Sequence, residues 1–248
     1  MVSWKQKPTV VNSAFDKFEM TPLKDPVSVR LKFRKVGNLQ YISHLDLQRV
    51  MGRVLLRSGV PVWFTQGFNP HPKLVFALPL SVGTQSECEY IDIKIDRKIA
   101  LVDLLARLNA EVTDEMRFLR AYYPNSKFTD IAAVGYVIEI SDTEIKKSTA
   151  SDAVKTLTTS PLNMIKRSKS GEREIDVTEY IKDVSCSVTV DKTLRLTVTI
   201  NGGEGTLNPE MIVTALREKL GILKEYPNKG LYTITRTNLY FADGREFE

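Results

Sequence analysis

Cysteine is scarce in this chain of 248 residues, and so are long apolar runs. Cys88 and Cys186 are far apart and each lies in an alternating, strand-like run, so the sequence indicates neither a disulfide framework nor a cysteine-based metal site. We expect both to be small core residues. No apolar stretch approaches the ~20 residues that cross a bilayer, and residues 1–26 lack the apolar core of a signal peptide. A cytoplasmic protein with no membrane span is therefore expected.

Acidic residues are nearly missing from one stretch, residues 30–79, which holds eight lysines and arginines but only Asp46 as an acid. The chain has a formal net charge of +5, so the rest of the sequence is slightly acidic and the basicity is local. Local basicity favours a surface that faces a polyanion, and a solvated face with its counterions is the alternative. The only two histidines, His44 and His71, lie in the same stretch and are the side chains whose unperturbed pKa is nearest to neutral.

The hydrophobic pattern predicts an α+β fold of two tandem ferredoxin-like (split βαβ) domains, with antiparallel sheets and helices on one face. Period-2 and period-3.6 segments alternate twice along the chain, and the pattern breaks near residues 124–130. We therefore predict an N-terminal extension at 1–26 and domains at 27–126 and 127–248. The expected strands are 29–34, 60–64, 73–78, 88–95, 115–123, 134–141, 162–168, 184–200 and 232–240. The expected helices are one from Ser43 to Gly59 and others at 96–109, 148–157 and 209–220.

The basic residues of the stretch divide between a strand and a helix. On the strand they alternate with Val29, Leu31 and Phe33, so they are expected to face outward. On the helix, whose N-cap is predicted to be Ser43, they recur every four residues opposite the apolar stripe, with Asp46 within reach of the first. The predicted nucleic-acid-binding residues of the two elements are Arg30, Lys32, Arg34, Arg49, Arg53 and Arg57.

The start of that helix is a candidate anion site, because free N–H groups and the positive end of the helix dipole meet there. His44 could act as a general acid or base in phosphodiester chemistry, with Tyr41 or an arginine stabilising charge. The alternative is that His44 is a helix-start residue packed at the edge of the sheet.

The segment Gly67-Phe-Asn-Pro-His-Pro-Lys73 is a candidate binding loop. Prolines on both sides of His71 restrict the backbone, so little entropy remains to be lost on binding. Phe68 could stack on a base, and Asn69 and Lys73 could reach phosphates or base edges. The alternative is a rigid connector that packs its aromatic ring into the domain.

No metal site is predicted. His44, Asp46 and His71 are suitable ligand types, but His-x-Asp on a helix directs its two side chains about 160° apart. The glycine-rich segment at 201–206 matches no phosphate-binding loop, and a flexible connector is the better interpretation.

At Tyr-Ile-Ser-His-Leu-Asp46 and Gly-Phe-Asn-Pro-His-Pro-Lys73 the chain closely resembles the radical SAM-linked protein family, a bacterial domain of unknown function that occurs alone or fused C-terminal to a radical SAM protein. The resemblance implies a radical SAM partner that carries an iron–sulfur cluster and S-adenosylmethionine. This chain lacks the Cys-x-x-x-Cys-x-x-Cys motif, so no cofactor is expected in it. Relatives are often encoded near ribosome and RNA-processing genes, which points to tRNA, rRNA or the ribosome. A weaker likeness is to the CRISPR repeat-processing endoribonucleases, to whose Tyr, His and Lys constellation Tyr41, His44 and Lys73 are similar in type.

Three functions stay open at this point. The first is an accessory RNA-binding protein that works with a separate radical SAM enzyme. The second is a metal-independent endoribonuclease-like enzyme that uses His44 and His71. The third is a protein-interaction module for the radical SAM partner. The sequence does not predict the oligomeric state.

Overall fold

The computed structural model describes residues 20–168, 171–203 and 206–248. Within it the chain divides into two compact units, whose segments alternate along the sequence. The described part of unit 1 consists of residues 20–34, 43–77 and 90–124, and unit 2 of 35–42, 78–89 and 125–248. The architecture is a mixed α+β one with mostly antiparallel pairing. The division differs from the predicted one at 35–42 and 78–89, two segments expected in the first domain that group with unit 2.

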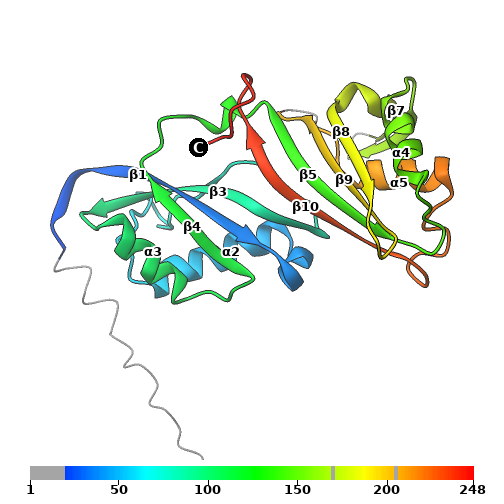
Figure 1. Ribbon diagram of the computed structural model, residues 1–248. Coiled ribbons are helices and arrows are strands. Elements are labelled where there is room, and N and C mark those ends of the chain that lie inside the picture. Colours follow the sequence, from blue (N-terminus) through cyan, green and yellow to red (C-terminus); the bar gives the residue numbers. More distant parts are fainter. Residues whose placement is uncertain (1–19, 169–170, 204–205) are drawn as a thin grey trace, which may run out of the picture. The chain divides into compact units, whose positions relative to one another are not determined.

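Unit 1 contains two helices and four strands. Its strand order is β4, β1, β3, and β2 pairs with β3 in antiparallel fashion. Helices α2 and α3 lie together on one side of these strands (Figure 1). The elements are β1 (Pro22–Lys35, of which Lys35 groups with unit 2), α2 (His44–Arg57), β2 (Val75–Phe76), the second half of β3 (Thr84–Arg97), α3 (Leu101–Asn109) and β4 (Met116–Tyr122).

The start of α2 follows the prediction. The Ser43 hydroxyl accepts a hydrogen bond from the backbone N–H of Asp46 at 3.2 Å, which satisfies one of the free donors of the first turn. The buried residues of the helix recur at helical spacing and are Leu47, Met51, Val54 and Leu55. Gly59 follows the helix with a φ of 64°, a conformation that glycine adopts without strain.

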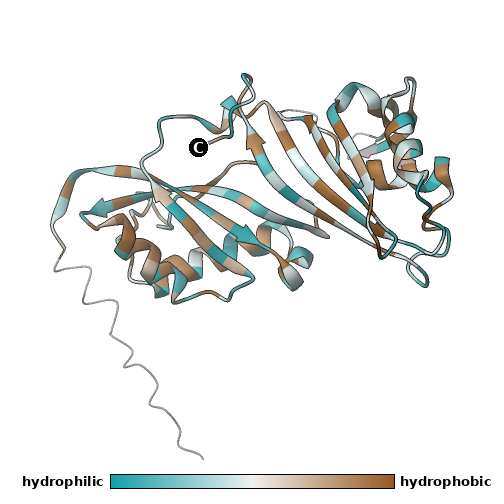
Figure 2. Cartoon of the chain, viewed as in Figure 1, coloured by the Kyte–Doolittle hydropathy of each residue, from teal (hydrophilic) through white to brown (hydrophobic). Residues whose placement is uncertain are grey.

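Unit 2 is built around four strands in the order β10, β5, β9, β8, and the first residues of β3 pair in parallel with β10. Helix α4 contacts β8 and α5, apolar residues alternate with polar ones along β9, and β5 is apolar and buried over most of its length (Figure 2). The elements are the 3-10 helices η1 (Gly37–Tyr41), η2 (Phe128–Asp130) and η3 (Val177–Tyr180), the strands β5 (Ala133–Ser141), β6 (Asn163–Ser168), β7 (Gly171–Asp176), β8 (Ile181–Val188), β9 (Thr193–Asn201) and β10 (Leu231–Tyr240), and the helices α4 (Thr149–Thr158) and α5 (Glu210–Leu220).

Several predicted bounds are wrong. β1 begins at Pro22, before the predicted end of the extension at residue 26; residues 1–19 lie outside the described part of the chain. The strands predicted at 60–64 and 73–78 shrink to β2 and two isolated bridges. Helix α3 begins five residues late because β3 continues to Arg97. Helix α5 begins at Glu210 rather than Pro209, although the Asn208 side chain still accepts a hydrogen bond from the Glu210 N–H at 3.2 Å.

The prediction that the basic side chains of β1 all face outward is wrong for Arg30. Its side chain is 1% exposed and forms a two-point ion pair with Asp92 on the neighbouring strand β3, at 2.7 and 2.9 Å. Period-2 alternation cannot reveal this partner, which lies 62 residues away. A carboxylate on the adjacent strand allows a guanidinium to be buried where an apolar side chain would otherwise be expected.

The two cysteines differ in burial. Cys88 is buried as predicted, whereas Cys186 on β8 is only half-buried. Burial raises the pKa of the Cys186 thiol to about 11, so it stays protonated at neutral pH. None of the helices in the described residues is long and apolar enough to cross a membrane.

Replacing Arg30 by Met tests the buried pair. Breaking such a pair strands a desolvated carboxylate, so the free energy of unfolding should fall by about 3 kcal/mol. The matched control is Arg49→Met, which breaks a solvent-exposed pair with Asp46 and should cost less than about 1 kcal/mol. Urea denaturation of both variants measures the difference, and equal losses would contradict this account.

Asp176, between β7 and η3, ties together three segments of unit 2. Its carboxylate accepts hydrogen bonds from the Ser160 hydroxyl at 2.6 Å, from the Leu162 N–H at 3.0 Å, and from the N–H and hydroxyl of Thr178 at 2.9 and 2.7 Å. These bonds, the one from Ser160 above all, lower the pKa of Asp176 to about 2. The ionised carboxylate is therefore favoured in the folded state.

The stability supplied by Asp176 should depend on pH. Because the folded-state pKa lies below that of the unfolded chain, about 3.9, the contribution is full above about pH 5 and disappears as the pH falls toward 2. Asp176→Asn should thus unfold at lower urea concentrations than the wild type at pH 7, and the gap should narrow as the pH falls from about 5 toward 2. Asp152→Asn, at an exposed carboxylate of α4, is the control. A gap that does not change with pH would show that the charge is not the cause.

Candidate functional site

Exposed arginines follow one face of α2 in unit 1. Arg49, Arg53 and Arg57 are spaced by four residues, and all three side chains are exposed. Arg49 pairs with Asp46 at 3.0 Å, as predicted. Hydrogen bonds from Ser43 and then from Arg49 lower the pKa of the Asp46 carboxyl.

The other two arginines of the helix differ in their partners. Arg57 forms an ion pair with the carboxylate of Glu111 at 2.9 Å and also donates to its backbone carbonyl at 3.0 Å. Within the described residues, Arg53 has no ion pair. Surface pairs of this kind are weak, so a phosphate group can replace the carboxylates at little cost.

The three residues of β1 that were predicted to bind nucleic acid are less accessible than those of α2. Arg30 is buried, as described above. Lys32 is half-buried, with its ammonium 5.6 Å from the centroid of the Tyr90 ring. Arg34 is half-buried and donates to the backbone carbonyl of Asp114 at 2.9 Å. Of the three, only Lys32 and Arg34 have charge at the surface.

The loop that carries Phe68 is closed at its base by Thr65 and His71. The Thr65 N–H donates to the His71 carbonyl at 3.0 Å, and the His71 N–H donates to the Thr65 hydroxyl at 3.2 Å. The imidazole Nδ1 lies 2.9 Å from the carbonyl oxygen of Asn69. Phe68 is fully exposed, and Asn69 and Lys73 are exposed as well. The ring of Phe68 therefore does not pack into the domain.

The two histidines have separate surroundings. The His44 ring is half-buried, stands edge-on to the Phe76 ring at 5.0 Å and lies 3.1 Å from the Gln48 amide. His71 is exposed and bonds within its own loop. Among the described residues no hydrogen bond or ring contact joins the two imidazoles. The described part of the chain also holds no group of three or more His, Cys, Asp or Glu residues placed to bind a metal ion.

Tyr41, the third residue predicted for catalysis, belongs to η1 and hence to unit 2. Its ring is 66% exposed and lines a cavity of that unit.

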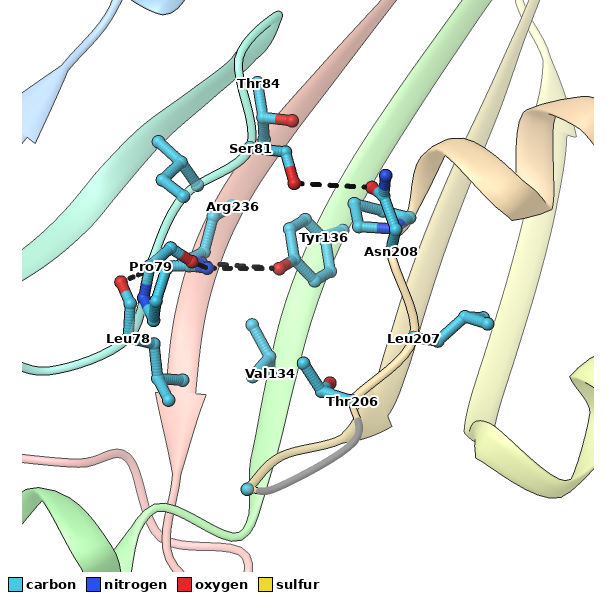
Figure 3. Close-up of a pocket in the computed structure, with 13 residues that line it drawn as sticks. Leu78, Pro79, Ser81, Thr84, Val134, Tyr136, Thr206, Leu207, Asn208 and Arg236 are labelled. Atoms are coloured by element: carbon cyan, nitrogen blue, oxygen red, sulfur yellow. Dashed lines mark hydrogen bonds between the residues drawn. The ribbon is translucent and has the colours of Figure 1, made fainter. Parts of the chain in front are cut away.

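A pocket that the sequence did not predict lies in unit 2 around Arg236 (Figure 3). Its volume is about 340 Å³. Ser81 donates to the Asn208 side chain across its rim at 3.5 Å, and Tyr136 points its hydroxyl toward Arg236. Most of the remaining wall is apolar and includes Leu78, Leu80, Val134 and Leu207.

Arg236 is almost fully buried in this wall, and its donors are all used. One nitrogen, Nη1, donates to Glu89 at 2.9 Å and to the Leu78 carbonyl at 3.3 Å. Nη2 donates to the Pro79 carbonyl at 2.9 Å and to the Tyr136 hydroxyl at 3.3 Å, and Nε donates to the same hydroxyl at 3.4 Å. Burial alone would lower the pKa of Arg236, but Glu89 and then Tyr136 outweigh it, so the pKa lies above its ordinary value.

Lys35 completes the buried charges. It is 1% exposed and donates to the Leu39 carbonyl at 3.0 Å. The pKa of Lys35 is lowered overall, mainly by burial. The nearby Glu89 carboxylate acts against this shift, and the Arg236 guanidinium adds to it. The cluster of Lys35, Glu89 and Arg236 thus joins β1, β3 and β10 within unit 2.

The sequence contains only a partial signal for this pocket. Arg236 and Glu89 each occur in a strand pattern and are not distinguished by charge from their exposed neighbours. The pocket residues come from four separate parts of the chain, at 78–81 and 84, at 134 and 136, at 203 and 206–209, and at 236. In β3, charged residues are interspersed among apolar ones. This pattern is the feature of the sequence that could have indicated a buried ion pair.

Comparison with solved structures gives only distant likenesses. The chain is similar to one chain of the crystal structure of a Cbf5-Nop10-Gar1 complex, at 9% identity and a TM-score of 0.43, over 85% of this chain and 48% of that one. It is also similar to a putative glycine cleavage system transcriptional repressor, at 8% identity and a TM-score of 0.23, over 85% of this chain and 98% of that one. The chain thus spans about half the length of the first. These TM-scores are too low to identify a shared fold.

Comparison with curated protein sequences finds no match. Residues 28–209 match a family described as "Uncharacterized protein conserved in bacteria (DUF2344)", and since the match spans most of the chain, the protein belongs to this family.

Proposed function

We propose that the protein binds RNA through unit 1, as an accessory protein to a separate radical SAM enzyme. The observation that carries this proposal is the exposure, in one unit, of the α2 arginines and of the Phe68 ring on a loop closed by hydrogen bonds. Arginines neutralise phosphates, and an exposed aromatic ring on a stiff loop offers a face on which an unpaired base can stack. An exposed phenyl ring without a partner is otherwise unfavourable in water.

The proposed RNA-contacting residues are those whose charged or aromatic groups reach the surface. Arg30 is not one of these residues, because its buried guanidinium forms an ion pair with Asp92. The remaining members are Lys32, Arg34, Arg49, Arg53, Arg57, Phe68, Asn69 and Lys73. tRNA, rRNA and ribosome-associated RNA are the substrate classes that the family resemblance suggests.

We further propose that each unit is a ferredoxin-like domain. In unit 1 the strand that follows the second helix, β4, lies beside β1, and β3 lies between β1 and β2. In unit 2 the equivalent order is β10, β5, β9, β8. Both orders agree with the split βαβ arrangement of two helices and four strands, which supports a tandem pair.

The radical SAM enzyme, with its cluster and S-adenosylmethionine, is proposed as a separate cytoplasmic polypeptide. A cluster needs several thiolates, whereas Cys88 is buried and the raised pKa of Cys186 keeps its thiol protonated. Any radical chemistry would thus take place on the partner, and this chain would hold or present the RNA.

Phosphate neutralisation by α2 makes RNA binding sensitive to salt. Changing Arg49, Arg53 and Arg57 together to Ala should weaken binding to unfractionated tRNA and reduce the slope of log K against log salt concentration by about 2. The control removes three exposed lysines of unit 2, by Lys147→Ala, Lys155→Ala and Lys219→Ala, with the same change in net charge. Fluorescence anisotropy across a salt series measures both. Equal slopes for the two triple variants would refute a role for α2, and cleavage of the RNA by the wild type would favour the endoribonuclease alternative.

Stacking on Phe68 should be separable from the charge effect. Phe68→Ala should weaken binding to a short single-stranded oligouridine about tenfold, since stacking contributes about 1–3 kcal/mol per base, while the salt slope stays unchanged. The melting temperature should also stay unchanged because the ring is fully exposed. Phe68→Tyr, which keeps a ring, is the matched control. An unchanged affinity in Phe68→Ala would remove the loop from the binding surface.

A further inference from the structure

A second cavity of unit 2 adjoins the Arg236 pocket and has a different chemistry. Its volume is about 300 Å³, and it shares the side chains of Ser81, Thr84 and Asn208 with the Arg236 pocket. Its wall contains one carboxylate and three phenol rings, and no other charged residue. These four residues are Tyr41, Glu210, Tyr226 and Tyr232.

The wall that carries Tyr41 is held in place by backbone and side-chain bonds. The Gly83 N–H donates to the Gln40 carbonyl at 2.9 Å, and the Gly37 N–H donates to the Gln85 side chain at 2.9 Å. These bonds fasten η1 to the segment before β3, so the position of Tyr41 beside the cavity does not depend on the packing of its exposed ring.

Glu210, the first residue of α5, is half-buried and accepts a hydrogen bond from the Tyr232 hydroxyl. Burial and then this bond raise the pKa of Tyr232, so the phenol remains a donor at neutral pH. In the residues that the structure describes, no lysine or arginine pairs with Glu210. The negative charge of the Glu210 carboxylate is therefore not offset by a basic side chain there, and most of its acceptor capacity remains.

The packing of the fold does not explain why three tyrosines lie around Glu210. The helix dipole favours an acid in the first turn of α5, and Tyr232 alone satisfies one oxygen. Neither fact explains why the Tyr226 ring lies 5.0 Å from that of Tyr232 with more than a third of its surface exposed, or why Tyr41 faces the same space while 66% exposed. Aromatic rings beside a carboxylate that forms no ion pair within the described residues are an environment that attracts cations and repels anions.

We propose that this cavity binds an organic cation, with a primary ammonium group against Glu210 and the tyrosine rings and an apolar body that extends into the Arg236 pocket. The two spaces adjoin at Ser81, Thr84 and Asn208, and the apolar side chains of the Arg236 pocket suit a hydrocarbon segment. Arg236 does not oppose such a ligand because its charge is offset by Glu89. The ammonium could belong to a small amine or to a lysine side chain of a partner protein.

The test compares two probes that differ only in charge, n-hexylammonium and 1-hexanol, by ligand-observed NMR and isothermal titration with the full chain. The wild type should bind the ammonium at least about tenfold more tightly than the alcohol, a charge-assisted hydrogen bond being the stronger kind. A lysine-containing tripeptide with blocked ends distinguishes the sources: tighter binding of the peptide indicates a protein side chain, and tighter binding of hexylammonium indicates a small amine.

Two variants locate the site. Glu210→Gln should abolish the preference for the ammonium, and Tyr41→Leu, at an exposed ring whose loss should not affect folding, should reduce ammonium affinity severalfold. Glu218→Gln, at an exposed carboxylate near the other end of α5, is the matched control and should bind as the wild type does. Equal binding of the two probes by the wild type, absence of binding by either, an ammonium preference that survives in Glu210→Gln, or one that is lost in Glu218→Gln would overturn the proposal.

Discussion

Unit 2 depends on a single buried ion pair, that between Arg236 and Glu89. The guanidinium supplies a donor to each of four groups from three separate segments, so one side chain sets the spacing of β3, β5 and β10. Two of its bonds go to the backbone carbonyls of Leu78 and Pro79, so the guanidinium also fixes the segment that leads into β3. The segment that contains these carbonyls forms one wall of the Arg236 pocket. Its later residues line the second cavity, the one that contains Tyr41 and Glu210. The Arg236–Glu89 pair therefore helps to hold the segment at residues 78–84 that lines both cavities.

Much of the fold follows from local patterns. The α2 helix could be predicted because its cap, its apolar stripe and its terminal glycine all agree. The elements β5, α4, α5 and β10 were recognisable from the hydrophobic pattern of their own residues. The bounds of β1, β3 and α3 could not, because hydrogen bonds between strands extend an element past the point at which its own sequence favours it. The interleaving of the units at 35–42 and 78–89 is also invisible locally, since it depends on partners more than 100 residues away, such as Arg236.

The candidate site in unit 1 was largely predictable, and the cavities of unit 2 were not. Arginines spaced by four on an amphipathic helix lie on one exposed face whatever the rest of the fold does, and a histidine between two prolines belongs to a stiff loop. Burial of a charge, by contrast, is decided by a partner on another strand. Arg30 and Arg34 occupy equivalent positions in the same alternating pattern, yet only Arg30 meets a carboxylate, Asp92, and turns inward. Tyr41 lies three residues before His44 in the sequence, but it belongs to unit 2, whereas His44 belongs to unit 1.

The course of β3 through both units bears on how this protein could have been inherited and how it can be divided. Its first residues pair with β10 and its last with the strands of unit 1, so neither unit is a continuous piece of the chain. A fragment that ends after Pro124 would keep Glu89 but lose Arg236, and would leave a carboxylate buried alone beside an unpaired strand edge. The smallest autonomous module is thus the interleaved pair. A gene rearrangement could move this pair intact into a larger polypeptide, but could not transfer either half without rebuilding its core.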